Sequence, residues 1–369
     1  MAQYFTERLQ KVFHMIFTSY NQEMAQEGLR QLELIVNNQH TPEQPNHRAL
    51  RNDMTTSLEN EIDTKEDALK IANDPEAREI ADAYALLARI YAGPRFTWEE
   101  SNFPENNMRT YQCLHDSIRR CSPIGTLQAL RINGTITPTV EKDMLISFDD
   151  AFRIVYDYAE QGDAFCQYII GNVFFWRDDN RINLARDMIT PPRLSLAKRI
   201  QQSLQKGSIQ ERLIALQGTI SNETLQENAT NLAKEWFNRA LDNGLAMFQG
   251  NLRNIYIDEG DFDNARRVAL TAAELGNPTM MLYTGLDCHE HGKFEDAFTW
   301  FTKGAALGQA ESTAELADYY YHFYDAKELR RVIPYDPVKA IGLYRRAATK
   351  YFSDAGYAAL QAAFGYIFH

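Results

Sequence analysis

LAKEWFNRALDNG (232–244), FDNARRVALTAAELG (262–276) and FEDAFTWFTKGAALG (294–308) carry one pattern three times, and this pattern decides the fold. The closing glycines are spaced 32 residues apart: Gly244, Gly276 and Gly308. Eight residues before its glycine, each segment has a bulky side chain: Trp236, Val268 or Trp300. A fixed period of this length is typical of stacked supersecondary units that are too small to bury their apolar faces alone. The sequence therefore predicts an all-α fold built from helical hairpins.

The pattern resembles the Sel1-like repeat, a relative of the tetratricopeptide repeat. The second helix of a unit has the form A-x-x-W-F-x-[KR]-[AG]-[AL]-x-x-G, and an aromatic residue follows three residues after a Leu-Gly or Leu-Ala pair in the first helix. The resemblance is clear over about residues 150–350 and degenerate before them. It implies a right-handed α-solenoid of about seven hairpins, with Trp236 and Trp300 in the seam between neighbouring units. Such proteins are most often bacterial adaptors in signalling, envelope or host-interaction processes.

The remaining sequence divides around the regular repeats. Residues 1–40 have apolar side chains at helical spacing and are predicted to form an N-terminal helical cap. Residues 41–60 have two prolines near their start and lack a periodic apolar pattern, which predicts a loop or hinge. Degenerate helical repeats with insertions follow over 61–225, and regular repeats with a C-terminal helix over 226–369.

Three long insertions fall between the two helices of a unit, at 93–107, 177–192 and 324–336. Insertions in repeat proteins collect on one edge of the solenoid, and that edge is often used in binding. Surface loops also tolerate extra length at little cost in free energy. Both interpretations stay open at this stage.

The composition limits the kinds of binding partner and the cellular compartment that we expect for this protein. A formal net charge of −12 and a pI near 5.2 argue against nucleic acid or an anionic membrane as the main partner. No apolar run of about 18 residues is present, so no membrane span is expected. Four scattered cysteines without C-x-x-C spacing and a first segment unlike a secretory signal favour a cytoplasmic, reducing compartment. Delivery into a host cell by a route that needs no signal peptide stays open.

The sequence has no recognisable catalytic signature. Phosphate-binding, dinucleotide-binding, nucleophile-elbow and zinc-protease motifs are all missing. The run Cys288-His289-Glu290-His291 contains metal-ligating residue types. On a helix, Cys288 and His291 would share a face, whereas His289 would point elsewhere. We therefore expect no cofactor, no metal and no catalytic residue. An enzyme with its site in the insertions is the third of three functional hypotheses.

The leading hypothesis is a non-catalytic scaffold that binds a peptide or protein on the concave solenoid face. The resemblance implies that groove-lining residues come ten, thirteen and fourteen positions after the glycine. Two of these positions hold Ile257 and Leu286, and the candidate binding residues are the other ten: Asn172, Phe175, Trp176, Asn254, Asp258, His289, Glu290, Asp318, Tyr321 and His322. The lysine of the family's carboxylate clamp would lie four residues before the asparagine, where Tyr168 and Gly250 stand. We therefore do not expect a receptor for chaperone tails. A groove of Trp, Tyr, His and Asp side chains favours an aromatic or basic peptide as the ligand.

The second hypothesis is a homo-oligomeric structural or regulatory assembly through the ends of the array. The segment 356–369 has no formal charge and places four apolar residues on one helical face: Leu360, Phe364, Ile367 and Phe368. Four exposed apolar side chains together favour self-association, for example as a homodimer. Alternatively, the insertion 324–336 covers them. Acidic residues also concentrate over 140–163 and basic residues over 324–351, which suits head-to-tail pairing.

Overall fold

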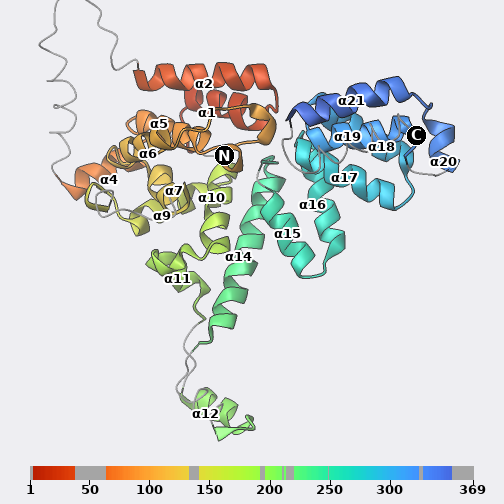
Figure 1. The fold of residues 1–369 in the computed structure, drawn as a ribbon. Coiled ribbons are helices and arrows are strands. Elements are labelled where there is room, and N and C mark those ends of the chain that lie inside the picture. Colours follow the sequence, from red (N-terminus) through yellow and green to blue (C-terminus); the bar gives the residue numbers. More distant parts are fainter. Residues whose placement is uncertain are drawn as a thin grey trace, which may run out of the picture.

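The computed structural model describes residues 3–37, 64–132, 141–191, 196–209, 212, 220–247, 249–323 and 327–350 (Figure 1). Within these residues the regular secondary structure is helical, without a strand. Consecutive helices pack side by side along the chain, which is the arrangement of a helical-repeat array. The all-α solenoid prediction is confirmed. The segments 41–60 and 356–369 lie outside the described residues, and so do Leu360, Phe364, Ile367 and Phe368.

The N-terminal helices and the first half of the array reach as far as residue 175. They are α1 (Glu7–Phe13), the π-helix η1 (His14–Thr18), α2 (Gln22–Asn37), α4 (Lys65–Asn73), α5 (Glu79–Tyr91), α6 (Asn107–Ile118), α7 (Pro123–Ile132), α9 (Phe148–Glu160) and α10 (Ala164–Phe175). Helix α5 pairs with α6, and α7 with α9. Apolar side chains of α1 and η1, such as Leu9 and Ile16, are fully buried.

The second half contains the regular repeats. Its helices are α11 (Asn183–Ile189), α12 (Leu196–Leu204), α14 (Asn222–Asp242), α15 (Gly250–Asp258), α16 (Phe262–Glu274), α17 (Pro278–Glu290), α18 (Phe294–Ala306), α19 (Ala310–Tyr321), α20 (Lys327–Val332) and α21 (Pro337–Lys350). The pairs are α10 with α14, α15 with α16, α17 with α18, and α19 with α21. Among the described helices, none combines the length and the apolar character that a bilayer span needs.

The repeated glycine has a backbone role. Gly244, Gly276 and Gly308 have φ of 88°, 101° and 90°, a left-handed conformation that costs a glycine little and ends the second helix of a unit. After two of them comes the residue that caps the next helix, since the side chains of Asn277 and Gln309 accept the first-turn amides of α17 and α19. The sequence period therefore marks the point where one hairpin ends and the next begins.

A second pair of glycines lets helices approach closely. A Cβ atom on Gly171 would lie 2.6 Å from the ring of Phe237, and one on Gly285 would lie 2.5 Å from the ring of Phe301. Both glycines belong to the first helix of a unit, and both phenylalanines to the second. The same contact thus recurs in the pairs α10–α14 and α17–α18, although a long insertion separates α10 from α14.

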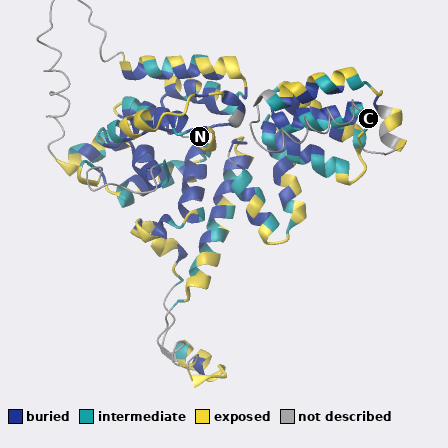
Figure 2. Ribbon diagram, in the orientation of Figure 1, coloured by how far each residue is buried: buried dark blue, intermediate teal, exposed yellow. Residues whose placement is uncertain are grey.

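The two tryptophans of the predicted seam differ in burial. Trp236 is 2% exposed, and its ring packs against Tyr156 at 5.4 Å between centroids. Trp300 is only partly buried, and the amine of Lys303 lies 4.2 Å from its ring centroid. The seam assignment therefore holds for Trp236, whereas Trp300 lies partly at the surface. Figure 2 shows the same gradation, with buried residues along the faces where paired helices meet.

The insertions differ in structure. In 93–107, which contains the 3-10 turns η3 (Pro94–Phe96) and η4 (Glu99–Ser101), Trp98 and Phe103 are buried, and Trp98 Nε1 donates to the carbonyl of Ile16 at 2.7 Å. This insertion therefore joins the N-terminal helices to the array. The second insertion forms η5 (Asp178–Asn180) and α11, which packs on α9 and α14. Further along, α12 stands away from the array and is mostly exposed (Figures 1 and 2).

Candidate binding pocket

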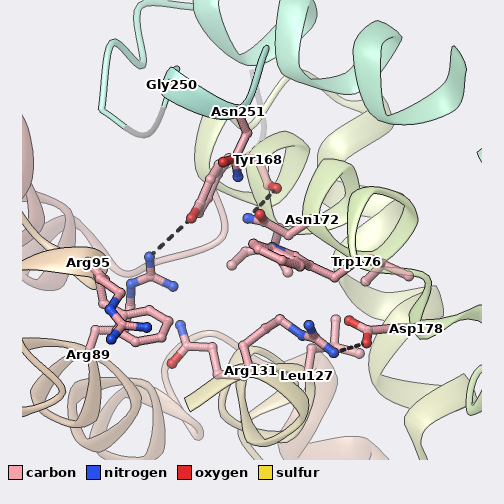
Figure 3. Close-up of a pocket in the computed structure, with 14 residues that line it drawn as sticks. Arg89, Arg95, Leu127, Arg131, Tyr168, Asn172, Trp176, Asp178, Gly250 and Asn251 are labelled. Atoms are coloured by element: carbon pink, nitrogen blue, oxygen red, sulfur yellow. Dashed lines mark hydrogen bonds and ion pairs between the residues drawn. The ribbon is translucent and has the colours of Figure 1, made fainter. Parts of the chain in front are cut away.

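A cavity of about 440 Å³ lies where α5, α7, α10 and the start of α15 converge (Figure 3). Small-molecule and side-chain pockets in proteins have volumes of roughly 300–1,000 Å³. The residues that line it are Arg89, Arg95, Phe96, Leu127, Gln128, Arg131, Tyr168, Ile169, Asn172, Val173, Trp176, Asp178, Gly250 and Asn251. Two of the insertions contribute, because Arg95 and Phe96 belong to the first and Asp178 to the second.

Arg89 forms the buried end of the cavity. Only 3% of it is exposed, and its Nη2 lies 3.5 Å from the hydroxyl of Tyr168. The guanidinium carbon is 5.7 Å from the ring centroid of Phe96 and 5.6 Å from that of Tyr168, within the range of cation–π attraction. The side-chain amide of Gln128 can make two hydrogen bonds in one orientation. Its nitrogen then donates to the carbonyl of Ala85 at 3.1 Å, and its oxygen accepts from Arg89 Nη1 at 3.2 Å. Aromatic rings and amide groups thus hold this cation beside the cavity.

A turn after α5 places the next cation. Gly93 has φ 95°, and a Cβ there would collide with the side chain of Glu105, so the position favours glycine. The chain then forms η3, which carries Arg95 and Phe96 to the cavity beside Arg89 (Figure 3). Arg95 is exposed, so its charge lies where the cavity meets solvent.

The opposite end of the cavity is an ion pair. Arg131 on α7 donates to the carboxylate of Asp178, and its guanidinium carbon lies 5.7 Å from the ring centroid of Trp176. Burial raises the pKa of Asp178 to about 6, and the guanidinium of Arg131 opposes part of that rise. The Nε atom of Arg131 is buried and has no hydrogen-bond partner among the described atoms. An unpaired buried donor is costly in free energy.

The backbone is strained beside this ion pair. Arg177, which follows the last residue of α10 and Trp176, has φ 62°, an uncommon conformation for a residue with a side chain. Its side chain donates to Asp179 at 2.7 Å. The turn brings Asp178 under Trp176 and against Arg131. Outliers of this kind concentrate at ligand sites, because the surrounding structure must over-determine them.

Two of the predicted groove residues line the cavity. Asn172 is 9% exposed, and its Nδ2 donates to the carbonyl of Tyr168 at 3.1 Å. Trp176 is 51% exposed, with its ring between Asn172 and Arg131 (Figure 3). Phe175 packs on the core residue Phe237, with 6.0 Å between ring centroids, and does not line the cavity.

The other predicted groove residues belong to later hairpins and do not line the cavity. Asn254, Asp258 and Glu290 are exposed. His289 Nδ1 lies 2.7 Å from the hydroxyl of Tyr319, and His322 Nε2 lies 2.7 Å from the carbonyl of Ile333.

Two further residues of the predicted groove contact tyrosine side chains. Asp318 accepts from the hydroxyl of Tyr344, and Tyr321 packs on Tyr335 with 6.0 Å between ring centroids. One groove along all these repeats stays a prediction. The expectation of a basic peptide drew on Asp258 and Asp318, whereas the cavity itself is lined by arginines.

The cysteine–histidine run has ordinary structural contacts. Cys288 is partly buried, and His291 Nδ1 lies 2.7 Å from the carbonyl of Asp287. Within the described residues, no group of three or more His, Cys, Asp and Glu side chains is arranged to hold a metal ion.

The sequence alone did not reveal the three arginines. They come from the degenerate region, where the repeat register cannot be assigned, and one of them lies in an insertion. The only signal was the aromatic composition of 93–107.

Comparisons with known proteins bear on the fold. No protein-family model matches the sequence. No curated protein matches it either. The chain is similar to the crystal structure of a Sel1 repeat protein from Oxalobacter formigenes, at 15% identity and a TM-score of 0.36, over 74% of this chain and 87% of that one.

It is also similar to a protective antigen present in uropathogenic Escherichia coli strains that displays an SLR fold. The identity is 16% and the TM-score 0.28, over 92% of this chain and 75% of that one. Both similarities concern the fold alone. The helix pairs and the glycine turns define an α-helical repeat protein of the solenoid class.

Proposed function

We propose that this chain is a non-catalytic interaction scaffold that binds a peptide or protein partner on the concave face of its solenoid. The cavity is the central contact. The observation that carries the proposal is how the cavity is built. Its lining residues are as far apart in the sequence as Arg89 and Asn251, and they come from several hairpins and two insertions. Only the folded array forms the site, which is how solenoids build extended binding surfaces.

The chemistry of the lining favours binding over catalysis. Its cations are arginines, which stay protonated and cannot exchange protons at neutral pH. Among the described residues that line it, the one carboxylate, Asp178, already pairs with Arg131. An apolar wall with a few convergent polar groups is typical of a recognition pocket. The exposed ring of Trp176 provides the kind of aromatic anchor that dominates binding energy at interfaces.

A crosslinking experiment tests this function. The photoreactive residue p-benzoylphenylalanine replaces Trp176 in the full chain, which is then irradiated in cells of the source organism. The matched control replaces Phe262, which is 57% exposed on α16 and does not line the cavity. We expect a discrete protein adduct from position 176 that position 262 does not give. If neither position, or both equally, gave that adduct, the scaffold function centred on this cavity would be rejected.

A further inference from the structure

We infer that the cavity recognises an acidic peptide segment in which a carboxylate adjoins a large apolar side chain. The inference rests on the proposed function, because it assigns the chemistry of the partner at the same site.

The charge of the cavity is opposite to that of the protein. The whole chain has 38 basic and 50 acidic residues, whereas the described part of the cavity lining has three arginines and one aspartate. Asp178 neutralises Arg131 in part, and the exposed Arg95 adds positive charge where the cavity meets solvent. In a concave site with low-dielectric walls, such a charge is focused and attracts anions. The net charge of the whole chain is −12, so a positively charged cavity gives an acidic segment a local point of attraction.

The positions of the donors suit a carboxylate. Arg89 and Arg95 lie at one end of the cavity and Arg131 at the other (Figure 3). Guanidinium groups present planar pairs of N–H donors that match the two oxygens of a carboxylate. The Arg131 side chain is 31% exposed, so part of it remains accessible to a ligand.

The apolar side of the cavity selects the neighbouring residue of the ligand. Phe96, Leu127 and Val173 contribute apolar surface to the lining, and half of Trp176 is exposed beside them. A large apolar side chain placed there would remove the exposed surface of Phe96 and Trp176 from water. If that side chain is aromatic, its ring can also stack on the ring of Trp176. A carboxylate alone would leave this wall uncovered, and an apolar residue alone would make no use of the charge of Arg95.

Peptide selection tests the inference. The full chain is immobilised and random phage-displayed peptides are selected on it. The variant is Arg95→Gln, because Arg95 is exposed and its loss leaves the core intact. The matched control is Arg186→Gln, an exposed arginine of α11 outside the cavity. Wild type and control should enrich peptides with Asp or Glu next to Phe, Trp, Leu or Ile.

The selected peptide is then synthesised and its affinity measured. It should bind Arg95→Gln about tenfold more weakly than wild type, as expected for one charge-assisted hydrogen bond. Replacing its acids by amides should weaken binding to wild type about tenfold, and binding to Arg95→Gln by clearly less. The charge reversal Arg95→Glu should shift the selection away from acidic peptides.

Three results overturn the inference: no enrichment on wild type, enriched peptides without acids, or equal affinity for wild type and Arg95→Gln. If position 176 still crosslinks a partner in such a case, the scaffold function stands and the ligand chemistry is wrong. If crosslinking also fails, the function itself is wrong.

Discussion

The backbone amide of Tyr4 donates a 2.9 Å hydrogen bond to Oδ2 of Asp163, which lies 159 residues further along the chain. Oδ1 of the same carboxylate accepts the amide of Cys166 at 2.9 Å and so caps α10. One side chain therefore starts the helix that forms a wall of the cavity and also fixes the N-terminal segment to it. The stacking of Phe5 on Phe165, with ring centroids 5.7 Å apart, extends this attachment.

Asp163→Ala is expected to lower the free energy of unfolding by about 2–4 kcal/mol. The loss combines a helix cap, worth about 1 kcal/mol, with a hydrogen bond to a charged acceptor, worth about 1.5–3 kcal/mol. Urea denaturation measures the change. The control is Ser221→Ala, which removes the cap of α14 and no tertiary bond of this kind, and should cost about 1 kcal/mol. Equal losses in the two variants would show that the Tyr4 bond contributes nothing.

Gly285→Ala should destabilise the protein by about 1–3 kcal/mol, because its Cβ would overlap the ring of Phe301. Gly342 in α21 is the matched control, since a Cβ there meets nothing within 4 Å. Gly342→Ala should stabilise the protein by about 0.5–1 kcal/mol through helix propensity. Thermal unfolding of both variants checks the prediction. Changes of the same sign at both sites would mean that the α17–α18 contact is looser than described.

Trp236→Ala should cost about 3–5 kcal/mol, the range for a buried aromatic truncated to alanine. Trp300→Ala should cost less, about 1–2 kcal/mol, because its ring is only partly buried. The sequence pattern predicts equal costs, since both residues occupy the same repeat position. Chemical denaturation of the two variants under one set of conditions decides between burial and repeat register as the better guide.

The regular repeats are predictable from sequence because their determinants are local. Gly276 ends a helix by its own backbone conformation, and Asn277 caps the next helix with its own side chain. Each unit therefore specifies its own turn, and the 32-residue spacing of the glycines makes these turns recognisable in the sequence. The close approach of Gly285 and Phe301 follows the same register.

The cavity and the N-terminal attachment are not predictable in this way, because they depend on contacts between distant segments. Arg78 lies fully buried between Tyr4 and Asp82, donating to the carbonyl of Tyr4 at 2.6 Å and to the Asp82 carboxylate at 3.0 Å. Nothing local marks this arginine as buried. Arg95 likewise reaches the cavity through an irregular turn. Residue types in an insertion do not reveal which distant helix they will meet.

The pH dependence of stability should change when Asp318 loses its charge. Burial raises the pKa of Asp318 to about 6, the hydrogen bond from Tyr344 on α21 opposes the rise, and the negative charge of Glu315 adds to it. An unfolded aspartate titrates near 3.9. Between about pH 4 and pH 6 the folded state therefore binds more protons at this site than the unfolded state. The contribution of Asp318 to stability falls as the pH rises through this window.

Asp318→Asn removes the titration but keeps an oxygen that can accept from Tyr344. We therefore expect the variant to match wild type near pH 4 and to exceed it by about 1–3 kcal/mol at pH 7.5, as measured by urea denaturation at both values. Asp261→Asn is the control of opposite sign, because bonds from Asn264 lower the pKa of Asp261. That variant should lose stability at pH 7.5 and recover it in acid. A pH profile of Asp318→Asn parallel to that of wild type would contradict the assignment of a partly buried carboxylate of raised pKa at the α19–α21 contact.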